Sequence, residues 1–249
     1  MLDGGDHDRG ETCGAAGQDS AEMGRSLDRL AASVVDGILD DIAAGRLNPG
    51  EPLAPEAALA ERFAVSKPVV REAMARLAVQ GVVAIRHGRT TVVQPLSGGA
   101  VAGLFATLAR AYGIAPGEFS ALRRAVEIEI AGLAAARASA DEVAGLIEAV
   151  ELMASEIRTI DPWVEADLLF HRRLAAIAGQ RLLAHLLEAL EASTRETMRN
   201  AKLKRDLATT QRALRCHIEL AEAVRARDPD RARALMVAHF DIVADLDGP

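Results

Sequence analysis

Four side chains in the C-terminal half of this 249-residue sequence could together bind a divalent metal ion. Asp167 and His171 stand four residues apart, so on a helix their carboxylate and imidazole project from one face, one turn apart. His217 lies 11 residues before Asp228 and His239 lies 11 residues after it, so a turn at Asp228 between antiparallel helices would place both imidazoles at similar heights. One carboxylate and three imidazoles suit Zn²⁺ first, with Ni²⁺, Mn²⁺ or Fe²⁺ as alternatives, and leave coordination positions open for a ligand.

Each of these histidines, taken alone, is equally typical of a hydrogen-bonded core or surface residue. The proposal of a metal site therefore depends on the arrangement of the four residues. His185 does not fit that arrangement and is interpreted as an ordinary histidine.

A basic segment interrupts an otherwise acidic chain. The whole sequence carries a net charge of −7, whereas residues 46–94 hold seven Lys and Arg against four Asp and Glu. Within 66–89 the only acidic residue is Glu72, and the basic residues are Lys67, Arg71, Arg76, Arg86 and Arg89. Such a segment is suited to contact with phosphates, although a solvated helix face would have the same composition.

The hydrophobic periodicity predicts which elements carry this segment. Residues 1–25 are rich in Gly, Asp and Ser without apolar periodicity, and we expect a flexible tail there. Helices are predicted from residue 26 to about 44, over 55–63 and over 66–80, followed by a hairpin of strands 82–85 and 91–94. Three helices and a hairpin over 26–94 correspond to a winged helix-turn-helix.

The basic residues fall where such a fold contacts DNA. The third predicted helix begins with Ser66, Lys67 and Pro68 and carries Arg71 and Arg76 further along. The tip of the hairpin contains Arg86, His87, Gly88 and Arg89. In winged helices the start of the third helix enters the major groove and the hairpin reaches the backbone or the minor groove. This coincidence favours a DNA-binding surface over a merely solvated one.

The rest of the chain is predicted to be an all-helical domain. Residues 95–99 form a linker, and seven helices follow within 100–249, at about 100–112, 117–137, 140–158, 162–178, 180–200, 205–226 and 229–246. Half of the residues are hydrophobic but only 3% are aromatic, as expected for a mostly α-helical protein built from alanine and leucine.

Other classes of protein are disfavoured. The N-terminus lacks the basic and apolar regions of a secretory signal, and charges interrupt every apolar stretch before it is long enough to span a membrane. The two cysteines, Cys13 and Cys216, are too far apart in the sequence to suggest a disulfide framework. A cytoplasmic protein is expected.

The segment GEPLAPEAALAERFAVSKPVVREAMARLAVQGVVAIRHGRTTVV (50–93) resembles the winged-helix signature of GntR-superfamily transcription regulators, and the helical remainder resembles the FCD effector domain of the FadR subfamily. The resemblance implies that Lys67 and Arg71 contact bases and phosphates and that His87 and Gly88 enter the minor groove. Lys67 stands where the family usually has arginine and cannot make the planar bidentate contact with guanine that arginine makes, so the operator sequence is open.

The same resemblance implies a role for the helical domain. Asp167, His171, His217 and His239 match the metal ligands of metal-binding FCD domains. Arg123 matches an arginine that would bind the carboxylate of a small organic or sugar acid; the alternative is a surface ion pair with Glu127.

The function implied is a repressor that binds a palindromic operator as a homodimer and is released by this acid. Two alternatives stay open: a regulator whose signal is the metal ion itself, and a metalloenzyme joined to a DNA-binding module.

Overall fold

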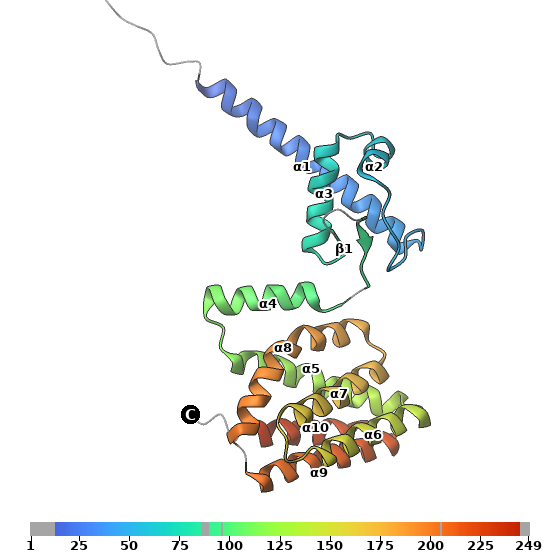
Figure 1. The fold of residues 1–249 in the computed structure, drawn as a ribbon, viewed down its shortest axis with the longest axis vertical. Coiled ribbons are helices and arrows are strands. Elements are labelled where there is room, and N and C mark those ends of the chain that lie inside the picture. Colours follow the sequence, from blue (N-terminus) through green and yellow to red (C-terminus); the bar gives the residue numbers. More distant parts are fainter. Residues whose placement is uncertain (1–12, 86–89, 96, 205, 245–249) are drawn as a thin grey trace, which may run out of the picture. The chain divides into compact units, whose positions relative to one another are not determined.

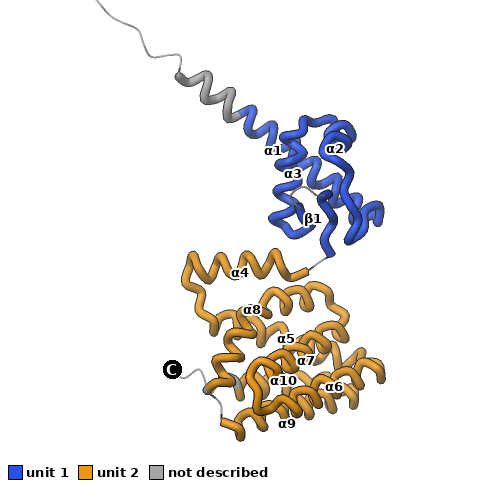
Figure 2. Tube along the Cα trace, in the orientation of Figure 1, with its two compact units in different colours: residues 1–96 blue, residues 97–249 orange. Residues whose placement is uncertain are grey.

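The computed structural model describes residues 13–85, 90–95, 97–204 and 206–244. Within these ranges the chain forms ten helices and one two-stranded sheet, which confirms the prediction of a mostly α-helical protein. The chain divides into two compact units, Met1–Leu96 and Ser97–Pro249 (Figures 1 and 2). Each unit has a hydrophobic core of its own.

The first unit has the element order of a winged helix-turn-helix. It contains α1 (Cys13–Ala43), α2 (Glu56–Arg62), α3 (Lys67–Val79), β1 (Val83–Ala84) and β2 (Val92–Val93). The two strands are antiparallel, with Val83 opposite Val93. The predicted helices and hairpin are therefore confirmed, while the predicted hairpin tip, residues 86–89, lies outside the described residues.

Apolar residues at helical spacing build the core of this unit. Val34 and Ile38 of α1 are fully buried together with Val70 and Leu77 of α3. Between α2 and α3 the chain turns through Ala64, whose φ of +52° lies in the left-handed region. This conformation costs a non-glycine residue roughly 1–2 kcal/mol, so the turn is maintained by the packing of the two helices around it.

A buried carboxylate links α1 to α2. Asp41 accepts hydrogen bonds from Arg46 Nε at 2.8 Å and from Arg62 Nη1 at 2.5 Å. The hydrogen bond from the Arg62 guanidinium is the main reason that the pKa of Asp41 lies below its ordinary value, although burial of the carboxyl opposes the shift.

The helix α1 corrects one expectation. It begins at Cys13, so residues 13–25, expected to be part of a flexible tail, are helical; residues 1–12 lie outside the described residues. Residues 13–25 contain three alanines, and their three glycines lower the helix propensity without blocking the i, i+4 bonds, since none of these residues is proline.

The second unit is helical throughout its described residues. Its helices are α4 (Gly99–Tyr112), α5 (Pro116–Arg137), α6 (Ala140–Ser155), α7 (Asp161–Ala178), α8 (Arg181–Lys204), α9 (Leu207–Arg225) and α10 (Pro229–Ala244). Each overlaps one of the seven predicted helices, so the all-helical architecture is confirmed. No helix in the described part of the chain is long and apolar enough to cross a membrane.

The helices of this unit surround a core to which α5, α7, α9 and α10 all contribute (Figure 1). α10 packs against α5 and α9, and α7 packs against α5, α6 and α8. The turn between α9 and α10 is short because the Asp228 side chain accepts a hydrogen bond from Arg231 N at 3.0 Å and so caps the start of α10. This turn fixes the register in which α9 and α10 face each other.

Candidate functional site

The four predicted metal ligands meet in the core of the second unit. Asp167 and His171 come from one face of α7, His217 comes from α9, and His239 comes from α10. All four are buried, and one potential ligand atom of each lies within 4.8 Å of those of the others. The structure therefore brings together all four residues that were selected from the sequence.

We call Asp167, His171, His217 and His239 the metal cluster, meaning the four side chains that could bind one metal ion. Their potential ligand atoms lie close together. His217 Nε2 lies 3.1 Å from Asp167 Oδ1 and 3.4 Å from His171 Nε2. His171 Nε2 lies 3.5 Å from Asp167 Oδ2. The two Nε2 atoms are within hydrogen-bond distance of each other, whereas both carboxylate oxygens of Asp167 are buried without a hydrogen-bond partner.

The second nitrogen of two of the imidazoles is already engaged. His217 Nδ1 donates a hydrogen bond to the carbonyl oxygen of Ala213 at 2.8 Å. His171 Nδ1 is in contact with the carboxylate of Glu127. In the neutral imidazoles, protons on the two Nδ1 atoms leave lone pairs on both Nε2 atoms, which face each other and Asp167. Electron-pair donors at these distances repel unless a cation lies between them, so the donor set fits a divalent metal ion.

Burial and charge act in opposite directions on these groups. Burial raises the pKa of the Asp167 carboxyl, but the imidazoles of His171 and His217 more than offset this, and the net pKa lies below its usual range. Burial lowers the pKa of His239 well below its ordinary value, and the neighbouring imidazoles add to this effect. An ionised carboxylate and a neutral imidazole are the forms that bind metals.

A buried ion pair lies directly behind the metal cluster. Arg123 Nε contacts the carboxylate of Glu127, whose other oxygen contacts His171 Nδ1. Both Arg123 and Glu127 are buried, so the alternative of a surface pair is wrong: the pair exists, but it is inside the unit. Arg123 Nη1 donates to Met198 Sδ at 3.7 Å, whereas Arg123 Nη2 is buried without a hydrogen-bond partner.

Sequence reasoning missed the position of Glu127 next to His171, a predicted metal ligand. A carboxylate that accepts a hydrogen bond from the outer nitrogen of a metal-binding histidine orients the ring and raises its basicity. The i, i+4 spacing of Arg123 and Glu127 was visible in the sequence. The contact with His171 was not, because α5 and α7 are separated by a whole helix and only tertiary packing brings them together.

Cys216, beside His217 in the sequence, does not join the metal cluster. Its Sγ donates to the carbonyl oxygen of Leu235 at 3.3 Å, and burial raises the pKa of the thiol to about 11. A thiol that stays protonated is a poor metal ligand and a poor nucleophile.

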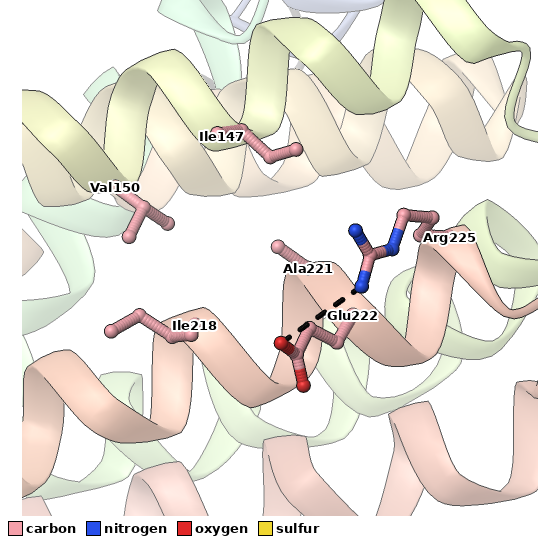
Figure 3. A pocket seen from close by; sticks show the side chains of 6 residues that line it. All are labelled: Ile147, Val150, Ile218, Ala221, Glu222 and Arg225. Carbon is pink, nitrogen blue, oxygen red and sulfur yellow. Dashed lines mark ion pairs between the residues drawn. The ribbon is translucent and has the colours of Figure 1, made fainter.

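A separate cavity of about 220 Å³ opens between α6 and α9 (Figure 3). Its apolar lining is Ile147, Val150, Ile218 and Ala221, and a pair of opposite charges, Glu222 and Arg225, lies at one side with 4.0 Å between the charged atoms. None of the residues of the metal cluster lines this cavity. It therefore offers apolar contact rather than metal coordination.

The predicted DNA contacts of the first unit fall into three groups. Ser66, Lys67 and Pro68 are exposed at the start of α3. Arg71, one turn later, is 63% exposed and forms a 3.8 Å ion pair with Glu56. These four residues form one exposed surface, the α3 N-terminal surface. The second group, Arg86, His87, Gly88 and Arg89, lies outside the described residues.

Arg76 forms the third group by itself, because it pairs within the unit. Its guanidinium contacts Glu72 at 2.9 Å and Asp28 of α1 at 2.6 Å. These two carboxylates neutralise Arg76 and raise its pKa, with the hydrogen bond to Glu72 as the larger cause. The pairing links α3 to α1. It also makes Arg76 less available for phosphate contact than Lys67 or Arg71.

Comparison with known proteins follows the same division. The family model of gntR-type bacterial regulatory proteins matches residues 30–93, and the FCD domain model matches residues 118–242. The transcriptional regulator LutR of Bacillus subtilis is 30% identical over 81% of this chain and 94% of its own length. The transcriptional repressor NanR of an Enterobacter species is 30% identical over 78% of this chain and 76% of its own length.

A solved structure has the same fold. The GntR protein of Streptococcus agalactiae superposes with a TM-score of 0.70 at 24% identity, covering 86% of this chain and 99% of that chain. This likeness concerns the arrangement of the helices and the hairpin.

Proposed function

Since the chain belongs to the GntR family of bacterial regulatory proteins and carries an FCD domain, it is a DNA-binding transcription regulator, and we propose that it is a metal-dependent repressor released by a small carboxylate. Members of these families are regulators rather than enzymes, so the metalloenzyme alternative is wrong. DNA as the partner favours action in the cytoplasm of a bacterial cell.

The observation that carries the proposal is the buried metal cluster. Both oxygens of its carboxylate lie among the imidazoles without a hydrogen-bond partner, and a divalent cation would satisfy these donors together. Zn²⁺ fits three imidazoles and one carboxylate first, and Ni²⁺, Mn²⁺ or Fe²⁺ would accept the same donors. When bound, the ion would supply open coordination positions for the oxygen atoms of a ligand.

Arg123 supports a carboxylate as that ligand. Its Nη2 is a buried donor without a hydrogen-bond partner, and such a donor costs free energy until an acceptor reaches it. A carboxylate would accept this hydrogen bond while its second oxygen, or a neighbouring hydroxyl, reached the metal. A small organic or sugar acid has the oxygen atoms for both contacts.

The α3 N-terminal surface supports the DNA contact. Lys67 and Arg71 are exposed at the start of α3. The first turn of a helix also has backbone N–H groups that have no partner within the helix. Both features attract phosphate. We assign major-groove contact to this end of α3. Arg76 is assigned a stabilising contact with α1 in place of the direct DNA contact expected from the sequence.

An apolar helix surface supports a homodimer. α4 has Arg110 as its single charged residue, yet Val101, Leu104 and Tyr112 are exposed on one face, Leu104 to 56% and Tyr112 to 77%. A second copy of the chain could cover this face without opposing like charges, and two copies would present two α3 helices to a palindromic operator.

The dimer has a direct test. A glutamate at position 104 would place like charges near each other across a two-fold axis. We expect Leu104→Glu to shift the mass measured by light scattering from dimer to monomer without changing the helical circular dichroism signal. If Leu104→Glu forms a dimer over the same range of protein concentration as the wild type, α4 is not part of the interface.

A thermal unfolding scan against small carboxylates, with and without a chelator, tests the ligand site. An acid at about 100 times its Kd should stabilise the folded state by about 2.7 kcal/mol. This corresponds to a rise of about 5–11 °C in Tm for a helical unit of this size. A rise that chelation abolishes is the expected result, and an equal rise after chelation would contradict a metal-assisted site.

The same scan separates the alternative in which the ion itself is the signal. The complete burial of the four donors favours that reading, because a buried site can bind an ion without help from a ligand. In that case chelation lowers Tm, but no acid raises it.

A further inference from the structure

The chain enters the second unit through a close backbone contact with α8. Gly98, the residue just before α4, is buried, and its N–H donates a hydrogen bond to Glu188 Oε2 at 2.8 Å. A Cβ at position 98 would lie 2.4 Å from the carbonyl oxygen of His185 and 2.5 Å from the backbone N of Ala189. Because these are backbone atoms, they cannot move aside locally, so glycine alone permits this contact.

The same helix, α8, is in contact with the residues behind the metal cluster. Met198 Sδ accepts a hydrogen bond from Arg123 Nη1, and Arg123 is linked through Glu127 to His171. Met198 and Glu188 are separated by ten residues of continuous helix, or about 15 Å along its axis.

Ion pairs join α8 to the helix that carries two of the predicted ligands. Arg195 of α8 pairs with Glu165 of α7 at 2.6 Å, and Arg172 of α7 pairs with Glu191 of α8 at 2.9 Å. A displacement of α7 on ion binding would therefore also displace α8 through these ion pairs. One unbroken set of contacts thus runs from His171 to Gly98.

We propose that Glu188 is a positioning residue, through which α8 transmits the occupancy of the metal cluster to the start of α4. The first unit ends at Leu96, two residues before Gly98, so the start of α4 is where the helical unit is covalently joined to the DNA-binding unit. The inference rests on the proposed function, because it requires an ion in the metal cluster. The start of α4 reports on this inference, and α9 around His217 reports separately on ion binding.

The experiment is amide hydrogen exchange on the full chain with and without Zn²⁺. Peptides covering residues 98–106 report on the start of α4, and peptides covering 213–220 report on α9 around His217. The variants are Glu188→Ala, which removes the acceptor, and Glu188→Gln, which retains an acceptor oxygen. Glu188 is half exposed, so its truncation leaves the core intact. Glu196→Ala, an exposed position on the same helix, is the matched control.

In the wild type, Zn²⁺ should slow exchange in both regions. We expect the slowing at 98–106 to be about fivefold or more, the lower end of typical coupling between sites. Glu188→Ala should retain the slowing around His217 and lose it at 98–106, while Glu188→Gln and Glu196→Ala should behave as the wild type does.

Two results would overturn the inference while leaving the metal site in place: equal slowing at 98–106 in Glu188→Ala, or no slowing there in the wild type although α9 responds. If Zn²⁺ leaves α9 unchanged in every chain, the metal site itself is wrong and the inference fails with it.

Discussion

Replacing Glu127 with glutamine tests whether the buried pair behind the metal cluster supports metal binding. The carboxylate of Glu127 contacts both His171 Nδ1 and Arg123 Nε. Glutamine keeps the size and one acceptor oxygen but removes the negative charge that makes the imidazole more basic. Loss of such an outer partner typically weakens metal affinity by about 10- to 100-fold. This equals about 1.4–2.7 kcal/mol of binding free energy.

The same change should lower the stability of the metal-free protein. Arg123 would be left buried without a counter-charge, and removing one partner of a buried pair costs about 3–5 kcal/mol. Zn²⁺ affinity should therefore be measured by competition with a chromophoric chelator at a temperature well below the Tm of the variant, after circular dichroism has confirmed that it is folded.

Glu129→Gln is the matched control for this measurement. Glu129 lies on the same helix, but it is exposed and its only recorded partner among the described residues is Arg233, at 3.5 Å. We expect its Zn²⁺ affinity to equal that of the wild type. Unchanged affinity in a folded Glu127→Gln variant, or an equal loss in Glu129→Gln, would refute the role assigned to Glu127.

Three further predictions follow from the site and the fold. His217→Ala should lower the bound metal per chain, measured by mass spectrometry after dialysis, because one of four ligands is removed. Lys67→Ala should weaken binding to a labelled random-sequence duplex and reduce the salt dependence by about one phosphate contact, whereas Arg76→Ala should leave the salt slope unchanged. Asp41→Asn should destabilise the first unit by about 1.5–3 kcal/mol in urea unfolding, the range for hydrogen bonds to charged groups.

Each of these has an outcome that contradicts it. Full metal content in His217→Ala would exclude that ligand, and equal salt slopes in Lys67→Ala and Arg76→Ala would contradict the division between the two residues. For Asp41, the folded pKa is lowered, so the carboxylate stabilises the unit above the ordinary aspartate pKa of about 3.9. This contribution should fall as the pH drops toward the lower folded value, and an unchanged pH dependence of unfolding in Asp41→Asn would be inconsistent with it.

The sequence alone determined those features that depend on local geometry. Helical periodicity and glycine or Asp-Pro breaks located the helices of the second unit within a few residues of their observed ends. The four-residue spacing of Asp167 and His171 placed them on one face of α7. The equal distances of His217 and His239 from the turn at Asp228 were enough to predict that they face each other, because a tight turn fixes the register of two antiparallel helices.

Tertiary structure decided every contact between elements distant in the sequence. Arg123 and Glu127 have the spacing of a surface pair, and only the packing of α5 against α7 and α8 buries them behind His171. Arg76 belongs to the basic segment, yet the position of α1 gives it Asp28 as a partner. The contact of Gly98 with His185, Glu188 and Ala189 of α8 likewise cannot be predicted from the local sequence around Gly98. Side-chain periodicity specifies which face of a helix is buried, but the residue that meets that face is chosen by the packing of the whole unit.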